Sequence, residues 1–266
     1  MVKFKYQDCE VKYMKLKIMS FNIRYDNPGD GLNSFSNRYK RTLEVIEKEA
    51  PDIIGFQEVT ESMRATVKNE LTGYEFAGCG RDANYHGEST LIAFRKGIFE
   101  FISCENVWLS KTPTVPGSRY HEDGHSGCCR MYTMIRLKHD EIEKPFRVVN
   151  THLDHEGGRL LESKQLTDAL SMLDEKFILT GDFNAEPYAP EIKNVTEALK
   201  DKGVIDCTAK LGPTFHAFGL IPKEKCIKID YIFTDGKCDK AYAVADEGKD
   251  GLYYSDHNAV CALIEL

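Results

Sequence analysis

The sequence predicts an α/β fold in which two mixed β-sheets pack together and helices flank them. Short strand-like runs and longer helix-like stretches follow one another along all 266 residues. Several strand-like runs lie between successive helix-like stretches, which indicates mixed sheets rather than a purely parallel one. Many of these runs also alternate apolar with polar residues, as expected of strands whose two faces differ.

Nine short apolar or alternating runs are predicted to be strands. The first reads KLKIMSFNI, another reads FRVVNTHL, and the last reads NAVCALIEL. Together they cover residues 15–23, 52–57, 89–94, 101–109, 131–137, 146–153, 176–181, 228–234 and 258–266.

Four longer stretches are predicted to be helices. In the first, Leu43, Ile46 and Ala50 recur on one face, and Pro51 follows where the helix is expected to end. The other three also have helical periodicity without internal proline. The four stretches are residues 38–50, 60–71, 158–175 and 190–202.

No internal repeat or low-complexity linker interrupts the chain, so a single domain of the size of an enzyme is expected over residues 15–266. Residues 1–14 form a short extension, either an extra strand or a loose leader, and translation starting at Met14 is an open alternative. No segment is apolar and long enough for a signal peptide or a membrane span. The nine cysteines are odd in number and contain no CxxC spacing. A reduced, cytoplasmic, monomeric protein is therefore expected.

The charge balance limits the classes of partner. The formal net charge is -7, and no run of Lys or Arg is long enough to form a basic arm. This argues against tight, sequence-independent binding of duplex DNA, because neutralised phosphates supply much of that affinity. A phosphate-bearing substrate is compatible with the charge, since a divalent cation in an acidic site supplies positive charge.

Polar side chains stand at the ends of the predicted strands. GDFN follows one of them directly, and positions i and i+2 of an extended chain project to the same face. Several strand ends are therefore expected to converge on one acidic cleft that also bears histidines. These residues are Asn22, Glu58, His152, Asp154, Asp182, Asn184, Asp230, Asp256 and His257.

Each of these residues also has a purely structural explanation. GDFN is equally a turn that ends a strand, and Asn22 is equally a capping residue. Glu58 suits the first turn of the following helix, where the helix dipole favours a carboxylate. Asp230 and His257 are individually typical of buried, hydrogen-bonded core residues. Only their joint occurrence favours a functional site.

Six ordered blocks resemble the endonuclease/exonuclease/phosphatase superfamily, which includes AP endonucleases, deoxyribonuclease I, inositol polyphosphate 5-phosphatases and nocturnin-like enzymes. The blocks are MSFNIRYDN, PDIIGFQEVT, VVNTHLDHEGGR, ILTGDFNAEP, KIDYIF and YSDHNAV, and they extend from about residue 15 to residue 266. The resemblance implies a four-layered α/β sandwich, with two mixed sheets face to face and helices outside. It also implies cleavage of a phosphate ester with Mg²⁺ or Mn²⁺ as cofactor.

The resemblance implies a role for each matched residue. Glu58 in QEV is similar to the family's metal-binding glutamate, with Asn22 beside it and Asp256 as a second ligand. Asp182 in GDFN would orient or deprotonate the attacking water, and Asn184 would contact a phosphate oxygen. The remaining catalytic residues are His152, which would stabilise the pentacoordinate phosphorus, His257, which would face the phosphate, and Asp230, which would hold the ring of His257.

Six further residues are predicted to bind substrate. The loop GRDANYHGES is similar to the family's substrate-side loop, although Tyr85 and His86 depart from the simpler pattern. Surface ion pairing is the alternative for the arginines. The predicted substrate-binding residues are Arg38, Arg81, Glu88, Arg130, Asp154 and Arg159.

A long loop, SKTPTVPGSRYHEDGHSGCCR, is expected to form the other wall of the pocket. His121 and His125 in this loop, with Cys128 and Cys129, match no zinc-ligand spacing, so they are interpreted as loop residues.

The sequence therefore predicts a metal-dependent phosphodiesterase or nuclease that acts on a small or single-stranded phosphate ester, such as an oligonucleotide, by direct attack of water. A phosphomonoesterase of the sugar or inositol phosphate type is the alternative reaction class. A non-catalytic binding module is the alternative from a different class, and its sign would be the loss of polar residues from the six blocks. None is lost. No membrane partner is expected, because no apolar insertion hairpin is evident.

Overall fold

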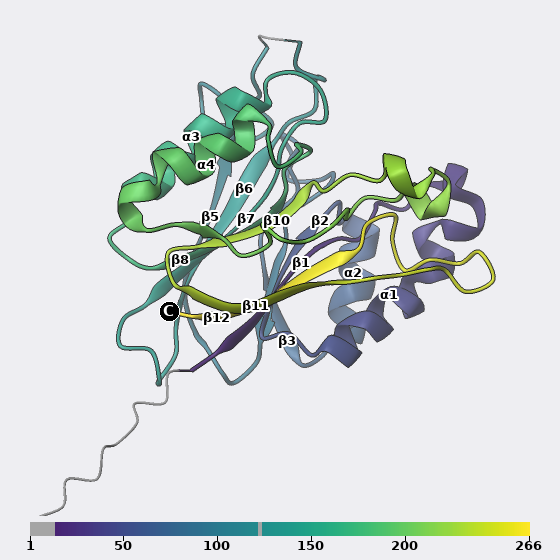
Figure 1. The fold of residues 1–266 in the computed structure, drawn as a ribbon, viewed down its shortest axis with the longest axis horizontal. Coiled ribbons are helices and arrows are strands. Elements are labelled where there is room, and N and C mark those ends of the chain that lie inside the picture. Colours follow the sequence, from purple (N-terminus) through teal and green to yellow (C-terminus); the bar gives the residue numbers. More distant parts are fainter. Residues whose placement is uncertain (1–13, 122–123) are drawn as a thin grey trace, which may run out of the picture.

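The computed structural model describes residues 14–121 and 124–266, which form two six-stranded sheets packed face to face with helices on the outer sides (Figure 1). The predicted extension over residues 1–14 lies outside the described residues except at Met14. In the first sheet the strand order is β11-β12-β1-β2-β4-β3, and in the second it is β5-β6-β7-β8-β10-β9. The predicted α/β sandwich of two mixed sheets is confirmed.

The first sheet comprises β1 (Leu16–Asn22), β2 (Ile53–Gln57), β3 (Tyr74–Ala77), β4 (Ile92–Arg95), β11 (Lys237–Val244) and β12 (Ala259–Glu265). The second comprises β5 (Glu100–Trp108), β6 (Met131–Lys138), β7 (Phe146–His152), β8 (Phe177–Asp182), β9 (Ile205–Asp206) and β10 (Asp230–Thr234). Both sheets are mixed, because β1 pairs parallel with β2 and β7 pairs parallel with β8 while their other neighbours are antiparallel.

The helices complete four layers. α1 (Phe35–Glu49) and α2 (Glu61–Glu70) cover the first sheet, and α3 (Arg159–Ser171) and α4 (Pro190–Ala198) cover the second (Figure 1). The four layers follow from the geometry of the central strands, because successive side chains of a strand point to opposite faces of the sheet. Ile178 packs between the two sheets, whereas its neighbour Leu179 packs under α3 and α4. The near-continuous apolar runs of the central strands are thereby explained.

Three strands were not predicted from the sequence. β3 and β9 are very short, and β11 reads KCDKAYAV, with charged residues among the apolar ones. All three are edge strands, and polar or charged residues are common at sheet edges because they oppose pairing with other chains. The third and fourth predicted helices end earlier than expected, at Ser171 and Ala198.

The two sheets approach closely at Gly55 of β2. A Cβ atom at this position would lie 2.0 Å from Thr180 Oγ1 and 2.7 Å from Asn150 Oδ1 on the facing sheet. Thr180 Oγ1 donates to Asn150 Oδ1 (3.0 Å), so neither side chain is free to move aside. Gly55→Ala is expected to lower the free energy of unfolding by about 3 kcal/mol, the upper end of overpacking effects. Urea unfolding would measure this; a loss below about 1 kcal/mol would contradict such close sheet packing.

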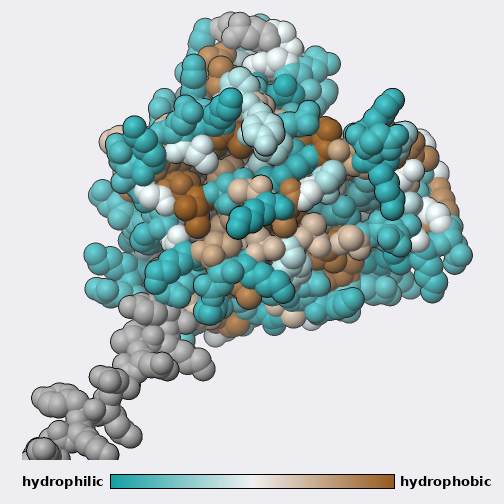
Figure 2. All heavy atoms as spheres, viewed as in Figure 1, coloured by the Kyte–Doolittle hydropathy of each residue, from teal (hydrophilic) through white to brown (hydrophobic). Residues whose placement is uncertain are grey.

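On the face of the molecule shown in Figure 2, hydrophilic residues predominate and apolar side chains form small groups among them. None of the helices within the described ranges has the length and apolar character required to span a membrane.

Candidate active site

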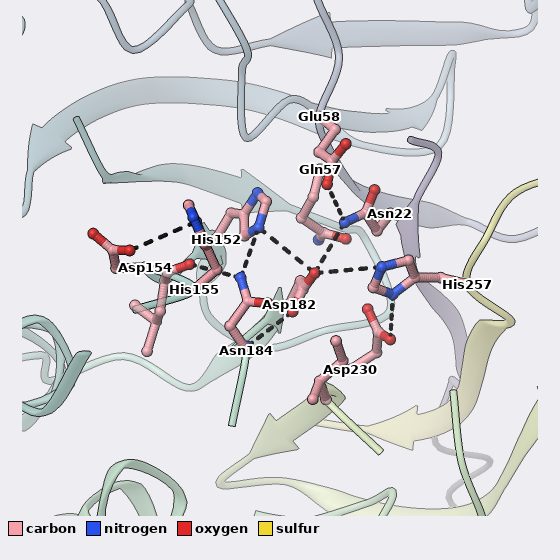
Figure 3. A network of polar contacts seen from close by, with 12 residues as sticks. Asn22, Gln57, Glu58, His152, Asp154, His155, Asp182, Asn184, Asp230 and His257 are labelled. Atoms are coloured by element: carbon pink, nitrogen blue, oxygen red, sulfur yellow. Dashed lines mark hydrogen bonds and ion pairs between the residues drawn. The ribbon is translucent and has the colours of Figure 1, made fainter. Parts of the chain in front are cut away.

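The predicted strand ends meet at one edge of the sandwich and surround a cavity of about 630 Å³. β1, β2, β7 and β8 end there, and β10 and β12 begin there, so side chains from distant segments lie together (Figure 3). Strand register accounts for much of the convergence. Asp182 of β8 has a register partner on each side. It is opposite His152 in the parallel β7–β8 pair and opposite Asp230 in the antiparallel β10–β8 pair.

Asp182 lies at the centre of this group (Figure 3). Its Oδ2 accepts a hydrogen bond from Asn22 Nδ2 (2.9 Å), and its Oδ1 accepts one from the backbone N–H of Asn184 (2.9 Å). Oδ2 also lies 3.6 Å from His152 Nε2 and 3.8 Å from His257 Nε2. Burial and the nearby Asp230 carboxylate raise the pKa of Asp182 to about 7. A carboxyl group with such a pKa is suited to accept a proton near neutral pH.

His257 is held as an imidazolium. Its Nδ1 donates to Asp230 Oδ2 (2.9 Å), and its Nε2 is directed toward Asp182 (Figure 3). Burial opposes the charge on this ring, but the Asp230, Asp256 and Asp182 carboxylates outweigh it and raise the pKa of His257 to about 10. The ring therefore presents a positively charged N–H beside the carboxylate of Asp182.

His152, in contrast to His257, is a neutral ring. Burial, together with the guanidinium groups of Arg130 and Arg81, lowers the pKa of His152 well below its usual range. Asn184 Nδ2 lies 3.1 Å from Nε2 of this ring and also donates to Leu153 O (3.0 Å). The amide thus fixes the orientation of a neutral imidazole.

Glu58 directly follows β2 and is held by two donors. Its Oε1 accepts from Asn22 Nδ2 (3.0 Å) and its Oε2 from the backbone N–H of Tyr25 (3.0 Å). Burial opposes ionisation, but these hydrogen bonds and Arg24 lower the pKa of Glu58. Asn22 donates to Asp182 as well, so one amide joins the two carboxylates.

Backbone strain is concentrated at this site. Glu58 has φ 64°, Asn184 has φ 48° and Arg24 has φ 52°, which are left-handed values that non-glycine residues rarely adopt. All three residues line the cavity. Such strain costs about 1–3 kcal/mol for each residue and persists where the surrounding structure enforces it, often at functional sites.

Comparison with known proteins identifies the family of the chain. The model of the endonuclease/exonuclease/phosphatase family matches residues 19–257, which include every residue of the cavity described above. The chain belongs to this family. Its members hydrolyse phosphoesters with a divalent metal ion, so the chain is a phosphoester hydrolase.

Solved structures of the family share the whole fold. A Bacteroides vulgatus member is 30% identical, with a TM-score of 0.86 over 95% of this chain and 99% of that chain. A mannosyl-6-phosphatase of Bacteroides thetaiotaomicron is 23% identical, with a TM-score of 0.82 over 94% of this chain and 100% of that one. D. rerio TDP2 in complex with a single-strand DNA product is 18% identical, with a TM-score of 0.73 over 95% and 99% of the two chains. The last two likenesses concern the fold alone.

The cavity residues fit the divalent ion that the family uses. The Glu58, Asp182 and Asp256 carboxylates all line the cavity. Burial raises the pKa of Asp256, and the nearby Glu58 carboxylate adds to this rise. Hard oxygen donors of this kind suit Mg²⁺ or Mn²⁺. The amide oxygen of Asn22 accepts from Arg24 N (2.9 Å), so here Asn22 orients Glu58 rather than directing its own oxygen into the cavity.

Three of the six predicted substrate-binding residues line the cavity, namely Arg81, Glu88 and Arg130. Arg81 Nη2 donates to Glu88 Oε1 (2.8 Å). Arg130 is only 3% exposed and contacts His155 Nδ1 through Nη2 (3.1 Å). Among the described residues, its Nε and Nη1 have no hydrogen-bond partner. A buried guanidinium with unused donors beside the cavity suits an anionic ligand.

The other three lie elsewhere. Arg38 is fully buried, and its guanidinium donates to the backbone oxygens of Asn33, Tyr254 and Arg24. Asp154 is buried, lies beyond the end of β7 at His152, and accepts from the backbone N–H of Ser126 in the neighbouring loop. Arg159 extends toward Glu191 on α4 (3.6 Å). These positions do not support direct contact with substrate, so Arg38, Asp154 and Arg159 are no longer assigned to it.

Sequence reasoning missed one whole wall of the cavity. The segment before β10 contributes apolar side chains there, and the Phe215 ring lies 5.0 Å from the His257 ring, centroid to centroid. Arg24, which the family block SFNIR contains, was also missed; it pairs with Asp30 (3.0 Å) and lies 3.8 Å from Asp256. Arg24 lies two residues after Asn22, and this spacing was the signal in the sequence that could have placed it at the site. The apolar wall comprises Phe215, Ala217, Phe218, Leu220, Ile227 and Ile229.

Proposed function

We propose that this enzyme hydrolyses a phosphodiester in a small or single-stranded substrate by direct in-line attack of water, with Mg²⁺ or Mn²⁺ as cofactor. The observation that carries the proposal is the position of Asp182. Its carboxylate is held by Asn22 and Asn184 and lies within 3.8 Å of ring nitrogens of both His152 and His257. A proton acceptor is thus placed next to groups that can contact one phosphoryl centre.

Each residue has a distinct part in this reaction. Asp182 orients the attacking water and accepts its proton as the new P–O bond forms and the P–O bond to the leaving alkoxide breaks; the alkoxide then takes up a proton from solvent. The charged N–H of His257 stabilises the negative charge that develops on the phosphoryl oxygens, and Asp230 keeps that ring charged and oriented. Asn184 and His152 contact the same oxygens. Glu58 and Asp256 would hold the divalent ion, which when bound supplies further positive charge at the phosphoryl group.

The cavity wall supports a substrate with an apolar, planar flank. Phe215, Phe218 and Ile227 line the cavity together with its polar residues, so one part of the ligand is recognised by apolar contact. Nucleic-acid bases stack on aromatic side chains with little sequence preference. A nucleoside beside the scissile phosphate fits this wall better than a hydroxyl-rich sugar.

One observation favours phosphomonoester hydrolysis as a second candidate. Besides Arg24, which pairs with Asp30, two guanidinium groups line the cavity, those of Arg81 and Arg130. A terminal phosphate carries a second negative charge, and paired arginines recognise such a group well.

The metal-binding part of the proposal is tested by thermal unfolding with Mn²⁺. Addition of Mn²⁺ is expected to raise the Tm of the wild-type protein, because an ion that binds only the native state stabilises it by about 2.7 kcal/mol at a hundredfold excess over Kd. Glu58→Gln is expected to lose most of this increase, because a neutral amide replaces the anionic oxygen ligand.

Glu88→Gln is the matched control, because Glu88 also lines the cavity but pairs with Arg81. It is expected to keep the Mn²⁺-dependent increase in Tm. An equal increase in Glu58→Gln and the wild type, or no increase in the wild type up to millimolar Mn²⁺, would contradict the assigned ion site.

A further inference from the structure

A second buried cluster of charged side chains lies beside the cavity and is not used in the reaction proposed above. His125, in the loop between β5 and β6, places Nδ1 2.9 Å from Asp154 Oδ2 and Nε2 2.7 Å from Glu162 Oε1. The three side chains are only 1%, 0% and 0% exposed. We call His125, Asp154 and Glu162 the histidine clamp.

The contacts of the clamp hold the ring at both nitrogens. Nε2 is hydrogen-bonded to Glu162 Oε1, whereas Nδ1 lies beside Asp154 Oδ2 and within hydrogen-bond distance of the backbone N–H of Gly127 (3.3 Å). The hydrogen bond that the ring donates to the Glu162 carboxylate raises the pKa of His125 in spite of burial. The three side chains are close enough to hold a metal ion, within 4.8 Å of one another. However, the two nitrogens point from different sides of one ring, so a single ion would not satisfy both contacts.

The backbone around the clamp is adapted to the ring. Gly158, immediately before α3, has φ 88°, and a Cβ atom there would lie 2.6 Å from His125 Cδ2. The clamp also ties the two segments together through main-chain groups. Ser126 N donates to Asp154 Oδ2 (3.1 Å), and Asp154 N donates to Glu162 Oε2 (2.8 Å). Breaking the clamp would therefore leave several buried polar groups without partners.

The same two segments meet again at the cavity. Arg130, five residues after His125, contacts His155, the residue that follows Asp154. The loop from His125 to Arg130 is thus held to the end of β7 at both ends, and that strand end carries His152. Arg130 also keeps unused donors at the cavity, as described above.

We propose that His125 is a positioning residue, which acts through the histidine clamp to hold Arg130 at the distance from His152 that phosphate binding requires. This inference rests on the proposed function, in which Arg130 contacts the substrate phosphate. His125 itself does not line the cavity and has no direct contact with substrate.

A double-mutant cycle in steady-state kinetics tests this role with His125→Ala, Arg130→Ala and the double variant. His125→Ala is expected to raise KM about tenfold with kcat within about threefold of wild type, as for loss of one charge-assisted hydrogen bond. In the Arg130→Ala background the same change is expected to alter KM less than twofold, because residues that act through one another are not additive. His139→Ala, a histidine in the β6–β7 turn, is the control and is expected to match wild type. Equal effects of His125→Ala in both backgrounds would overturn the proposal.

Hydrogen exchange separates failure of the clamp from failure of the proposed function, because it requires no activity. The amides of Ser126 and Asp154 are expected to exchange slowly in the wild type and at least tenfold faster in His125→Ala. Unchanged exchange would overturn the clamp, whereas faster exchange with an unaltered KM in Arg130→Ala would refute only the assigned role of Arg130.

Glu162→Gln provides a second variant if His125→Ala does not fold. It keeps the size of the side chain and an acceptor oxygen, so a smaller KM increase, about threefold, and partial loss of amide protection are expected. Metal analysis of the purified wild type completes the test. A stoichiometric ion lost in His125→Ala but kept in Glu58→Gln would show a metal site in place of the hydrogen-bonded ring and would overturn the proposal.

Discussion

Asp182→Asn is expected to lower kcat for phosphoester hydrolysis by about 10³-fold, because general acid–base groups contribute about 10²–10⁴-fold. The variant keeps the shape of the side chain and one acceptor oxygen, but it removes the group that takes the proton from water. Its stability in EDTA is expected to equal or exceed that of the wild type. Asp182 and Asp230 are buried register partners, so the change removes one of two neighbouring negative charges.

The combination of outcomes separates a catalytic role from a structural one. Activity would be measured with saturating Mg²⁺ or Mn²⁺, and stability by thermal unfolding. Asp230→Asn is the matched control. It removes the neighbouring negative charge, but Asp230 acts through His257 and not on the attacking water. Retention of more than a tenth of wild-type kcat in Asp182→Asn would contradict its role as the proton acceptor, and a large fall in Tm would indicate that it serves the fold.

His257→Ala is expected to lower kcat by about 10²–10³-fold, the usual effect of removing one donor to a developing oxyanion. Unlike Asp182→Asn, it is expected to destabilise the fold by about 3 kcal/mol, because the buried Asp230 carboxylate loses its charged partner. Within the described part of the chain, Asp230 Oδ1 already has no hydrogen-bond partner.

The double variant Asp230→Asn/His257→Ala tests this explanation. It is expected to recover most of the lost stability, because no unpaired carboxylate remains at position 230, but none of the activity. Urea unfolding and steady-state kinetics would measure the two effects. A His257→Ala protein as stable as the wild type would contradict the charged pair, and substantial kcat would contradict the contact with the phosphoryl group.

The central part of the site could be predicted from the sequence because strand ends and strand register determine it. Both explanations of GDFN are realised, since Asp182 closes a turn by accepting from Asn184 N and also faces the cavity. Asp154 shows the limit of the two-residue periodicity. It would share a face with His152 only if β7 continued, and the strand ends at His152.

The rest of the site depends on tertiary packing that residue spacing does not encode. Arg38 looks like a surface cation in the sequence, yet its helix buries it completely among backbone oxygens. Phe215 and Phe218 belong to an irregular segment, so no periodicity assigns them to a cavity wall. The ion partners of His125 are distant in sequence, which is why the loop gave no recognisable spacing.

The most direct test of the account is the release of p-nitrophenol from bis-p-nitrophenyl phosphate and from p-nitrophenyl phosphate, by the wild type and by Asp182→Asn, with Mg²⁺ or Mn²⁺ and with EDTA. The account predicts metal-dependent hydrolysis of the diester by the wild type, abolished by EDTA and by Asp182→Asn. Hydrolysis of the monoester alone would support the second candidate function. Hydrolysis that persists unchanged in Asp182→Asn or in EDTA would contradict the proposed mechanism.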